Sequence, residues 1–309
     1  MKALQLNEKN EIALQDIAIP TIADDEVLIK IAGSGINPVD WKIADGMLAF
    51  LINQPLPLTL GSDLSGTITH IGSNVKQFNV GDKVYAMAEI GFDGSFAEYC
   101  RVNVSALSLA PKCESLEQAS AYPLASLTAW QSLFSIGQLQ AEQRILIHAA
   151  AGGVGHIAVQ LAKAIGAYVI ATASSHNENY LHELGADVVL DYHNDDITAT
   201  LQNSPVDMVF DTLGGQAQID SLQIIRSGGR LVSITGLSEE TETLAARKNI
   251  HALFHFVQSN GEQLTHIAEL IDSGKLKANI QQTFELENHK AAFSLSANGH
   301  IRGKLIFTL

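Results

Sequence analysis

The sequence predicts an α/β protein of two domains, a β-rich domain followed by a doubly wound parallel-sheet domain. The first hundred residues hold short β-branched segments separated by glycine, asparagine and aspartate. After residue 137, nearly continuous apolar segments alternate with helical ones, and a glycine-rich run follows the first of them. A chain of 309 residues with 46% hydrophobic content is long enough for two separate cores.

The β-rich part has strands predicted over 27–35, 64–72 and 82–88. One short helix is predicted over 38–46, with Asn37 as its cap and a proline in the first turn. Many short strands with irregular connections are typical of a compact β-rich domain.

The second part begins with helical periodicity and then alternates strand and helix. Apolar strands that alternate with helices indicate a parallel sheet covered on both faces. The chain closes with two further helices and a final strand. Helices are predicted over 115–121, 124–136, 154–166, 180–185, 196–202, 216–226, 261–273 and 287–297, and strands over 145–150, 168–173, 187–190, 207–212, 229–236 and 304–309.

Composition excludes several classes of function. The formal net charge is -14 without a basic block, which disfavours nucleic acid as a partner. The two cysteines, Cys100 and Cys113, match no zinc or redox spacing and are expected to be reduced thiols. No signal-peptide pattern and no membrane-length apolar segment is present, so we expect a cytoplasmic protein without a membrane partner.

The strongest single motif is the run AAAGGVG at 149–155, between a predicted strand and a predicted helix. Glycines there let the backbone approach a pyrophosphate, and the helix N-terminus offers free N–H groups and a positive dipole. The run therefore predicts a dinucleotide site that includes Ala151, Gly152, Gly153 and Val154. The alternative is that the glycines only permit tight packing of helix on strand.

The end of the next strand bears on the choice of dinucleotide. An acidic residue there binds the ribose hydroxyls of NAD and repels a 2′-phosphate. This strand runs instead into Ser174, Ser175 and His176, and Tyr192 follows the next strand. These side chains favour NADPH. No arginine or lysine lies between Lys163 and Arg226, so the attraction for a phosphate is modest and NADH stays possible.

An ordered set of motifs extends over nearly the whole chain. They are GINPVDWK at 35–42, GSDLSG at 61–66, GDKVY at 81–85, GSFAEY at 94–99, LTAW at 127–130, AAAGGVG at 149–155, FDTLGG at 210–215 and RGK at 302–304. In them the chain resembles the zinc-independent quinone oxidoreductase branch of the medium-chain dehydrogenase/reductase superfamily. The resemblance implies a GroES-like catalytic domain over 1–120, to which 265–309 returns, and a Rossmann domain over 121–264.

The chain departs from the zinc alcohol dehydrogenases of that superfamily at their metal ligands. Asn37 and Ser62 stand where those enzymes carry a cysteine and a histidine, and no cysteine lies near 123–125. Zinc prefers sulfur and imidazole ligands, so no metal is expected.

The resemblance also implies roles for individual residues. Asn37 is the candidate for a polar contact to the substrate carbonyl, or only a helix cap. Judged from the residues themselves, Asp40 and Asp63 are either a carboxylate pair for acid–base work, or Asp40 stabilises the helix dipole while Asp63 ties loops together. Trp41 walls the substrate pocket together with Phe50, or packs in the core. Beyond the loop and the strand-end residues named above, the predicted cofactor contacts are Thr128, Leu213, Thr235, Gly236, His255, Phe256, Arg302 and Lys304.

Without a Lewis acid an alcohol is hard to deprotonate, whereas quinones and enones already accept hydride. The expected function is NADPH-dependent reduction of a quinone or α,β-unsaturated carbonyl compound, with a small hydrophobic substrate and a homodimeric state. Two alternatives stay open. One is an enoyl-type reductase of a larger substrate, and the other is a non-catalytic NADPH-binding sensor or structural protein.

Overall fold

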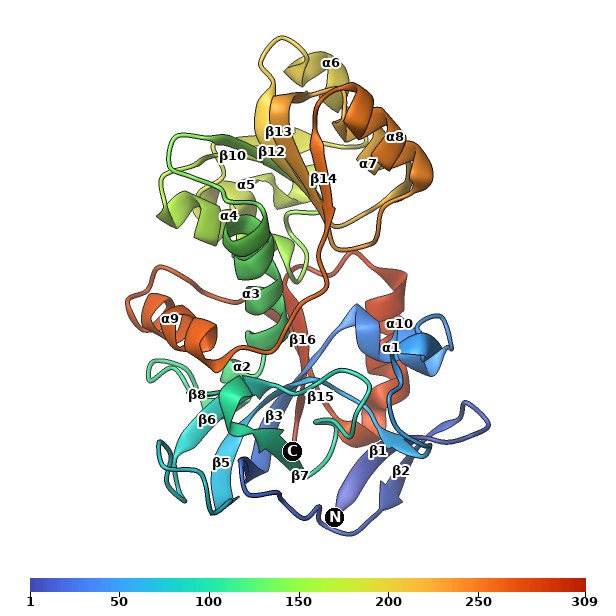
Figure 1. The fold of residues 1–309 in the computed structure, drawn as a ribbon, viewed down its shortest axis with the longest axis vertical. Helices are drawn as coiled ribbons and strands as arrows, with labels where there is room; N and C mark the ends of the chain where they lie inside the picture. Colours follow the sequence, from blue (N-terminus) through green and yellow to red (C-terminus); the bar gives the residue numbers. More distant parts are fainter. The chain divides into compact units, whose positions relative to one another are not determined.

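The computed structural model describes residues 1–309. Backbone contacts divide the chain into two compact units. The first unit comprises Met1–Leu127 together with Gln258–Leu309, and the second comprises Thr128–Val257 (Figure 1). The domain boundaries predicted from the sequence, at 120/121 and 264/265, stay predictions about how the chain is divided.

The first unit is built on two β-sheets. The larger one has the strand order β15-β16-β3-β5-β6-β8, with β7 also paired to β3, and the smaller one has the order β2-β1-β4. Their strands are β1 (Lys2–Leu6), β2 (Ile12–Asp16), β3 (Glu26–Ile36), β4 (Leu58–Thr59), β5 (Asp63–Ile71), β6 (Lys83–Met87), β7 (Tyr99–Asn103), β8 (Leu107–Leu109), β15 (Ile280–Glu285) and β16 (Lys304–Thr308).

The final strand closes the larger sheet against the N-terminal part of the chain. β16 lies antiparallel to β3, with Leu305 opposite Ile36 and Phe307 opposite Ser34. The ring of Phe307 meets that of Phe96 edge-on at 4.9 Å between centroids, and both side chains are fully buried. Edge-to-face aromatic packing of this kind fixes the position of the C-terminal strand in the core.

Helices of the first unit connect and cover these strands. The predicted helix after Asn37 is α1, with Pro38 at its first position, where a missing N–H costs nothing. The helices are α1 (Pro38–Ala44), α2 (Leu116–Ala119), α9 (Gly261–Asp272) and α10 (His289–Asn298), and α3 (Pro123–Trp130) spans the division between the units in sequence.

The second unit is a parallel sheet of six strands in the order β11-β10-β9-β12-β13-β14. In chain order this is 3-2-1-4-5-6, the Rossmann arrangement. Its strands are β9 (Arg144–Ile147), β10 (Tyr168–Ala173), β11 (Val188–Asp191), β12 (Val206–Asp211), β13 (Ile225–Ser233) and β14 (His251–Phe254). The helices that alternate with them are α4 (Gly155–Ala164), α5 (Glu178–Glu183), α6 (Ile197–Leu201), α7 (Gly215–Ser221) and α8 (Glu239–Arg247).

The sequence predicted the α/β alternation of the second unit up to β13. It gave no ranges for α8 and β14, nor, in the first unit, for β1, β2, β4, β7, β8 and β15. The helix predicted over 216–226 is shorter than expected, because α7 ends at Ser221 and β13 already begins at Ile225. None of the helices has both the length and the apolar character needed to cross a membrane.

Candidate functional site

The glycine-rich run forms the turn between β9 and α4. Gly155 opens the helix, and a Cβ there would lie 2.4 Å from the Ala149 carbonyl oxygen. No larger residue fits that approach, so the tight packing weighed as an alternative is present. The helix N-terminus at Val154 nevertheless has no side-chain cap and no acidic residue in its first turn, so its dipole favours an anion, although the backbone N–H of His156 already donates to the Gly152 carbonyl oxygen at 3.0 Å.

The position of this turn in the sheet also favours a ligand-binding role. The chain runs from β9 to β10 and β11 on one side, and β12 pairs with the other side of β9. In open α/β sheets, ligands bind at the carboxyl ends of the strands where the strand order reverses. Gly152, Gly153 and Val154 are half-exposed at this point, so the residues present fit a dinucleotide pyrophosphate.

The end of β10 carries the predicted specificity residues. Ser175 and His176 are exposed, and Tyr192, at the end of β11, is 44% exposed. The structure adds a group that the linear sequence did not suggest: Asp191 is the register partner of Ala173. Its carboxylate accepts hydrogen bonds from the backbone N–H of His193 at 3.0 Å and from Asn194 Nδ2 at 2.7 Å. These two bonds and the Ser175 hydroxyl hold the pKa of Asp191 below its usual range.

The remaining predicted cofactor residues of the second unit lie mostly on loops. Leu213 and Thr235 are exposed and follow β12 and β13, next to Gly236. His255 and Phe256 follow β14 directly. His255 is buried, its Nε2 lies 3.1 Å from the Gln131 amide oxygen, and burial lowers its pKa. Thr128 is buried on α3.

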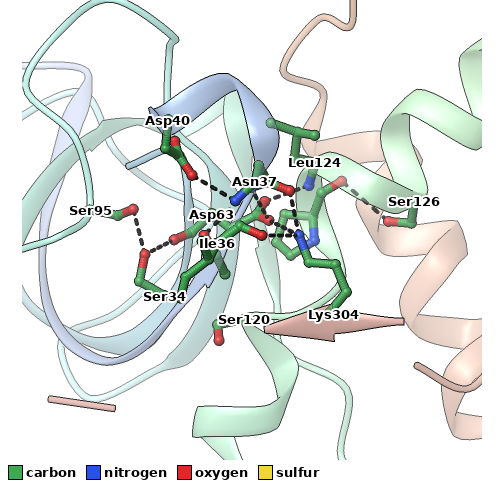
Figure 2. A network of polar contacts seen from close by, with 12 residues as sticks. Ser34, Ile36, Asn37, Asp40, Asp63, Ser95, Ser120, Leu124, Ser126 and Lys304 are labelled. Atoms are coloured by element: carbon green, nitrogen blue, oxygen red, sulfur yellow. Dashed lines mark hydrogen bonds and ion pairs between the residues drawn. The ribbon is translucent and has the colours of Figure 1, made fainter. Parts of the chain in front are cut away.

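A second candidate site is a buried polar network in the first unit (Figure 2). It brings together Asn37 at the end of β3, Asp63 at the start of β5 and Lys304 at the start of β16. The Lys304 ammonium donates to Asn37 Oδ1 and lies 3.2 Å from Asp63 Oδ2 and 3.3 Å from the Ile36 carbonyl oxygen. Lys304 is 3% exposed and Asp63 is fully buried.

The network fixes the orientation of the Asn37 amide. An ammonium only donates hydrogen bonds, so the atom facing Lys304 is the amide oxygen. A carboxylate only accepts, so Asn37 Nδ2 faces Asp63 Oδ2, at 2.9 Å. The second amide hydrogen has only a weak contact, with the Gly35 carbonyl oxygen at 3.5 Å. One donor of Asn37 is therefore weakly engaged.

Asp40 and Asp63 are both buried but do different things. Asp63 ties three elements together, since Oδ1 also accepts from the backbone N–H of Leu124 at 2.5 Å, and burial raises its pKa against the lowering effect of Lys304. Asp40 Oδ2 accepts from the backbone N–H of Asn37 at 2.7 Å. Burial raises the pKa of Asp40 to about 8, so this carboxyl carries a proton at neutral pH.

Trp41 and Phe50 lie in different surroundings. Trp41 packs against the hydrophobic cluster of the first unit, and its buried Nε1 has no hydrogen-bond partner. Phe50 is 77% exposed, so core packing does not describe it. Arg302 is half-exposed and its backbone N–H donates to Gln281 Oε1, whereas Lys304 is enclosed by the network. Their cofactor contacts stay predictions.

The predicted absence of a metal concerns the same region. Asn37 and Ser62 are buried. No group of three or more histidine, cysteine, aspartate or glutamate side chains could hold a metal ion. The ammonium of Lys304 lies beside Asn37. That the protein works without zinc stays a prediction, which a measurement of its zinc content would test.

Comparison with known proteins finds family matches in both the N-terminal and the C-terminal part of the chain. Residues 23–112 match the alcohol dehydrogenase GroES-like domain, and residues 184–307 match a family described as zinc-binding dehydrogenase. The chain is 30% identical to a mitochondrial NAD(P)H oxidoreductase from Danio rerio, over 97% of this chain and 89% of the relative. It is 33% identical to 2-methylene-furan-3-one reductase from Solanum lycopersicum, over 94% of this chain and 74% of the relative.

Among solved structures, the quinone oxidoreductase from Coxiella burnetii superposes with a TM-score of 0.93 at 34% identity, covering 100% of this chain and 99% of that one. The chain belongs to the quinone oxidoreductase branch of the medium-chain dehydrogenase/reductase superfamily. Membership of this oxidoreductase family confirms the resemblance drawn from the motifs and the predicted combination of a GroES-like and a Rossmann fold.

Proposed function

We propose that this protein transfers hydride from NADPH to a quinone or an α,β-unsaturated carbonyl compound. The observation that carries the proposal is the uncapped N-terminus of α4, which follows a glycine turn at the reversal point of a 3-2-1-4-5-6 sheet. That arrangement binds the diphosphate of a dinucleotide. The name of the Danio rerio relative, an NAD(P)H oxidoreductase, is consistent with it.

The preference for NADPH rests on the end of β10. Ser174, Ser175 and His176 offer hydroxyls and an imidazole to a 2′-phosphate, and Tyr192 adds a phenol. The carboxylate of Asp191 is nearby and accepts hydrogen bonds from His193 and Asn194, which keep it ionised. Its negative charge opposes a 2′-phosphate, so the preference for NADPH that we expect from the polar side chains at the strand end is modest.

When bound, the reduced nicotinamide supplies the hydride, and the chain supplies orientation and hydrogen bonds. Reduction of a quinone or enone leaves negative charge on the acceptor oxygen, where a preorganised donor is most effective. We propose Asn37 as that donor, through its weakly engaged amide hydrogen. Lys304 and Asp63 hold the amide in this orientation and prevent it from rotating.

Asp40 and Trp41 complete the proposed catalytic group. Asp40 is protonated at neutral pH and buried beside the backbone of Asn37, so it carries a proton without adding negative charge next to Asp63. Trp41 provides an apolar wall suited to a flat hydrophobic acceptor. The Solanum lycopersicum relative, named as a reductase of a methylene-furanone, supports the enone as one acceptor class.

The assembly and location complete the proposal. β14 is an edge strand of the second unit, with one side unpaired, and we propose that the protein is a homodimer. Equilibrium ultracentrifugation at micromolar concentration tests this, and a monomer would contradict it. The cytoplasmic location stays a prediction, since the Danio rerio relative is mitochondrial by name.

A steady-state assay tests the function. NADPH oxidation is followed by absorbance with a panel of 1,4-benzoquinone, 2-alkenals and enoyl thioesters, each with NADH in parallel. We expect turnover with a quinone or an alkenal and a lower KM for NADPH than for NADH. Turnover only with thioesters would favour the larger-substrate reductase, and tight NADPH binding without any turnover would favour the sensor.

A further inference from the structure

A buried polar network joins the two loops that follow β12 and β13 in the second unit. Its members are Asp211 at the end of β12, Gln218 on α7, Ser233 at the end of β13 and Thr241 on α8. Each of these side chains is at most 2% exposed. The proposed hydride transfer gives none of them a role, yet they lie at the carboxyl end of the sheet, where a doubly wound fold binds its ligand.

Asp211 is the centre of this network. Its Oδ1 accepts hydrogen bonds from the backbone N–H groups of Leu213 at 3.0 Å and Gly214 at 2.9 Å. Its Oδ2 accepts from Gln218 Nε2 at 2.8 Å and Ser233 Oγ at 2.7 Å. A carboxylate has about four acceptor positions, so this one is fully used by uncharged donors. Such a group keeps its partners in place, because a displaced donor would be left buried and unpaired.

Gln218 extends the network to the second loop. Its Nε2 also lies 2.9 Å from the Gly236 carbonyl oxygen, and its Oε1 accepts from the Thr241 hydroxyl at 2.7 Å. The loops also touch directly: a Cβ at Gly214, whose φ is 72°, would lie 2.7 Å from Thr235 Oγ1. The segments 211–215 and 233–236 therefore behave as one piece of structure.

These two segments contain Leu213, Thr235 and Gly236, the predicted contacts to the ribose and nicotinamide side of the cofactor. We propose that Asp211 and Gln218 are positioning residues for the cofactor, which act by holding both loops in their binding arrangement. This inference rests on the proposed function. Both side chains are buried, so we expect them to act through the loops that they connect and not by touching the cofactor.

The test is the nearly isosteric substitution Asp211→Asn in the full-length protein. An amide accepts at one atom only, so two of the four donors face an N–H group instead of an oxygen. We expect the dissociation constant for NADPH, measured by protein fluorescence, to rise about tenfold or more, as for the loss of buried hydrogen bonds. The KM for NADPH should rise in parallel, while kcat with 1,4-benzoquinone at saturating NADPH stays within about threefold.

A matched control lies at the other end of the same strand. Asp207 accepts from the backbone N–H of Arg144 and pairs with the Arg226 guanidinium. Asp207→Asn should lower stability and leave the NADPH dissociation constant unchanged.

If Asp211→Asn does not fold, Ser233→Ala removes a single donor, and we expect an increase in the dissociation constant of about threefold. A folded Asp211→Asn or Ser233→Ala protein with the dissociation constant and KM of the wild type would overturn the inference and leave the proposed function standing. A wild-type protein that binds neither reduced nicotinamide would overturn both.

Discussion

Replacing Lys304 by methionine removes the cation from the buried network of the first unit. The ammonium lies 3.2 Å from Asp63 Oδ2, and the two side chains are 3% and 0% exposed. Asp63 would keep only the Asn37 amide and the Leu124 N–H as donors. Breaking a buried ion pair from one side costs about 3–5 kcal/mol, because the remaining charge is buried without compensation. We expect Lys304→Met to lose that much unfolding free energy at pH 7.

The stability lost in Lys304→Met should depend on pH in a definite direction. Lys304 lowers the pKa of Asp63 against the raising effect of burial, so its removal lets the pKa rise further. The variant's folded state then binds a proton more readily than its unfolded state does. Its deficit relative to the wild type should be largest at high pH and shrink as the pH falls and Asp63 becomes neutral.

The assay is urea unfolding followed by fluorescence in a Trp130→Phe background, so that Trp41 reports on the first unit. Lys2→Met is the control, because it removes an ion pair with Glu287 whose partners are 55% and 51% exposed, and such an exposed pair contributes little to stability. The double variant Lys304→Met/Asp63→Asn should recover most of the loss. A Lys304→Met protein no less stable than Lys2→Met would show that the Lys304–Asp63 ion pair does not stabilise the first unit.

Three further predictions concern the pH response, the cofactor and the metal. The folded-state pKa of Asp40, about 8, is above its ordinary value, so this group makes wild-type stability fall as pH rises from about 4 towards 8. Between pH 5.5 and 8 this loss of unfolding free energy amounts to at most ~3 kcal/mol. Urea unfolding of Asp40→Asn should show a pH dependence without this loss, and a pH dependence equal to that of the wild type would contradict the prediction. Ser174→Asp places a carboxylate at the end of β10 and should weaken NADPH binding by about tenfold while changing NADH little, as measured by fluorescence titration; equal losses for both would refute the specificity argument. Elemental analysis of the purified protein should find far less than one zinc per chain. One bound zinc per chain would contradict the prediction that the residues around Asn37 hold no metal.

The sequence predicted what depends on local pattern. The glycine run, the apolar strands and the helices between them follow from periodicity and punctuation, and the Rossmann alternation was recovered up to β13. α8 was missed because few of its residues are apolar, although its terminal signals are present: Ser238 accepts from the N–H of Thr241, and three glutamates lie in the first turn. β15 reads IQQTFE and is mostly exposed, so it lacks the alternation that identifies a half-buried strand.

The parts of the site that depend on distant pairing were not predictable. The cofactor contact expected of Lys304 stays a prediction, whereas its contact with Asp63 joins residues 241 positions apart and is encoded by no local pattern. Asp191 lies beside the end of β10 only because β10 and β11 are paired in a particular register. Gln218 looks like an ordinary helical residue until the structure places it between two loops.

Isothermal titration of the purified protein with NADPH measures the dinucleotide site itself. We expect saturable binding near one cofactor per chain, and a clear loss of affinity in Gly155→Ala, whose added Cβ would lie 2.4 Å from the Ala149 carbonyl oxygen and displace the start of α4. No saturable binding of NADPH or NADH to the wild-type protein would contradict the assignment of the α4 N-terminus as a dinucleotide site, and with it the proposed chemistry.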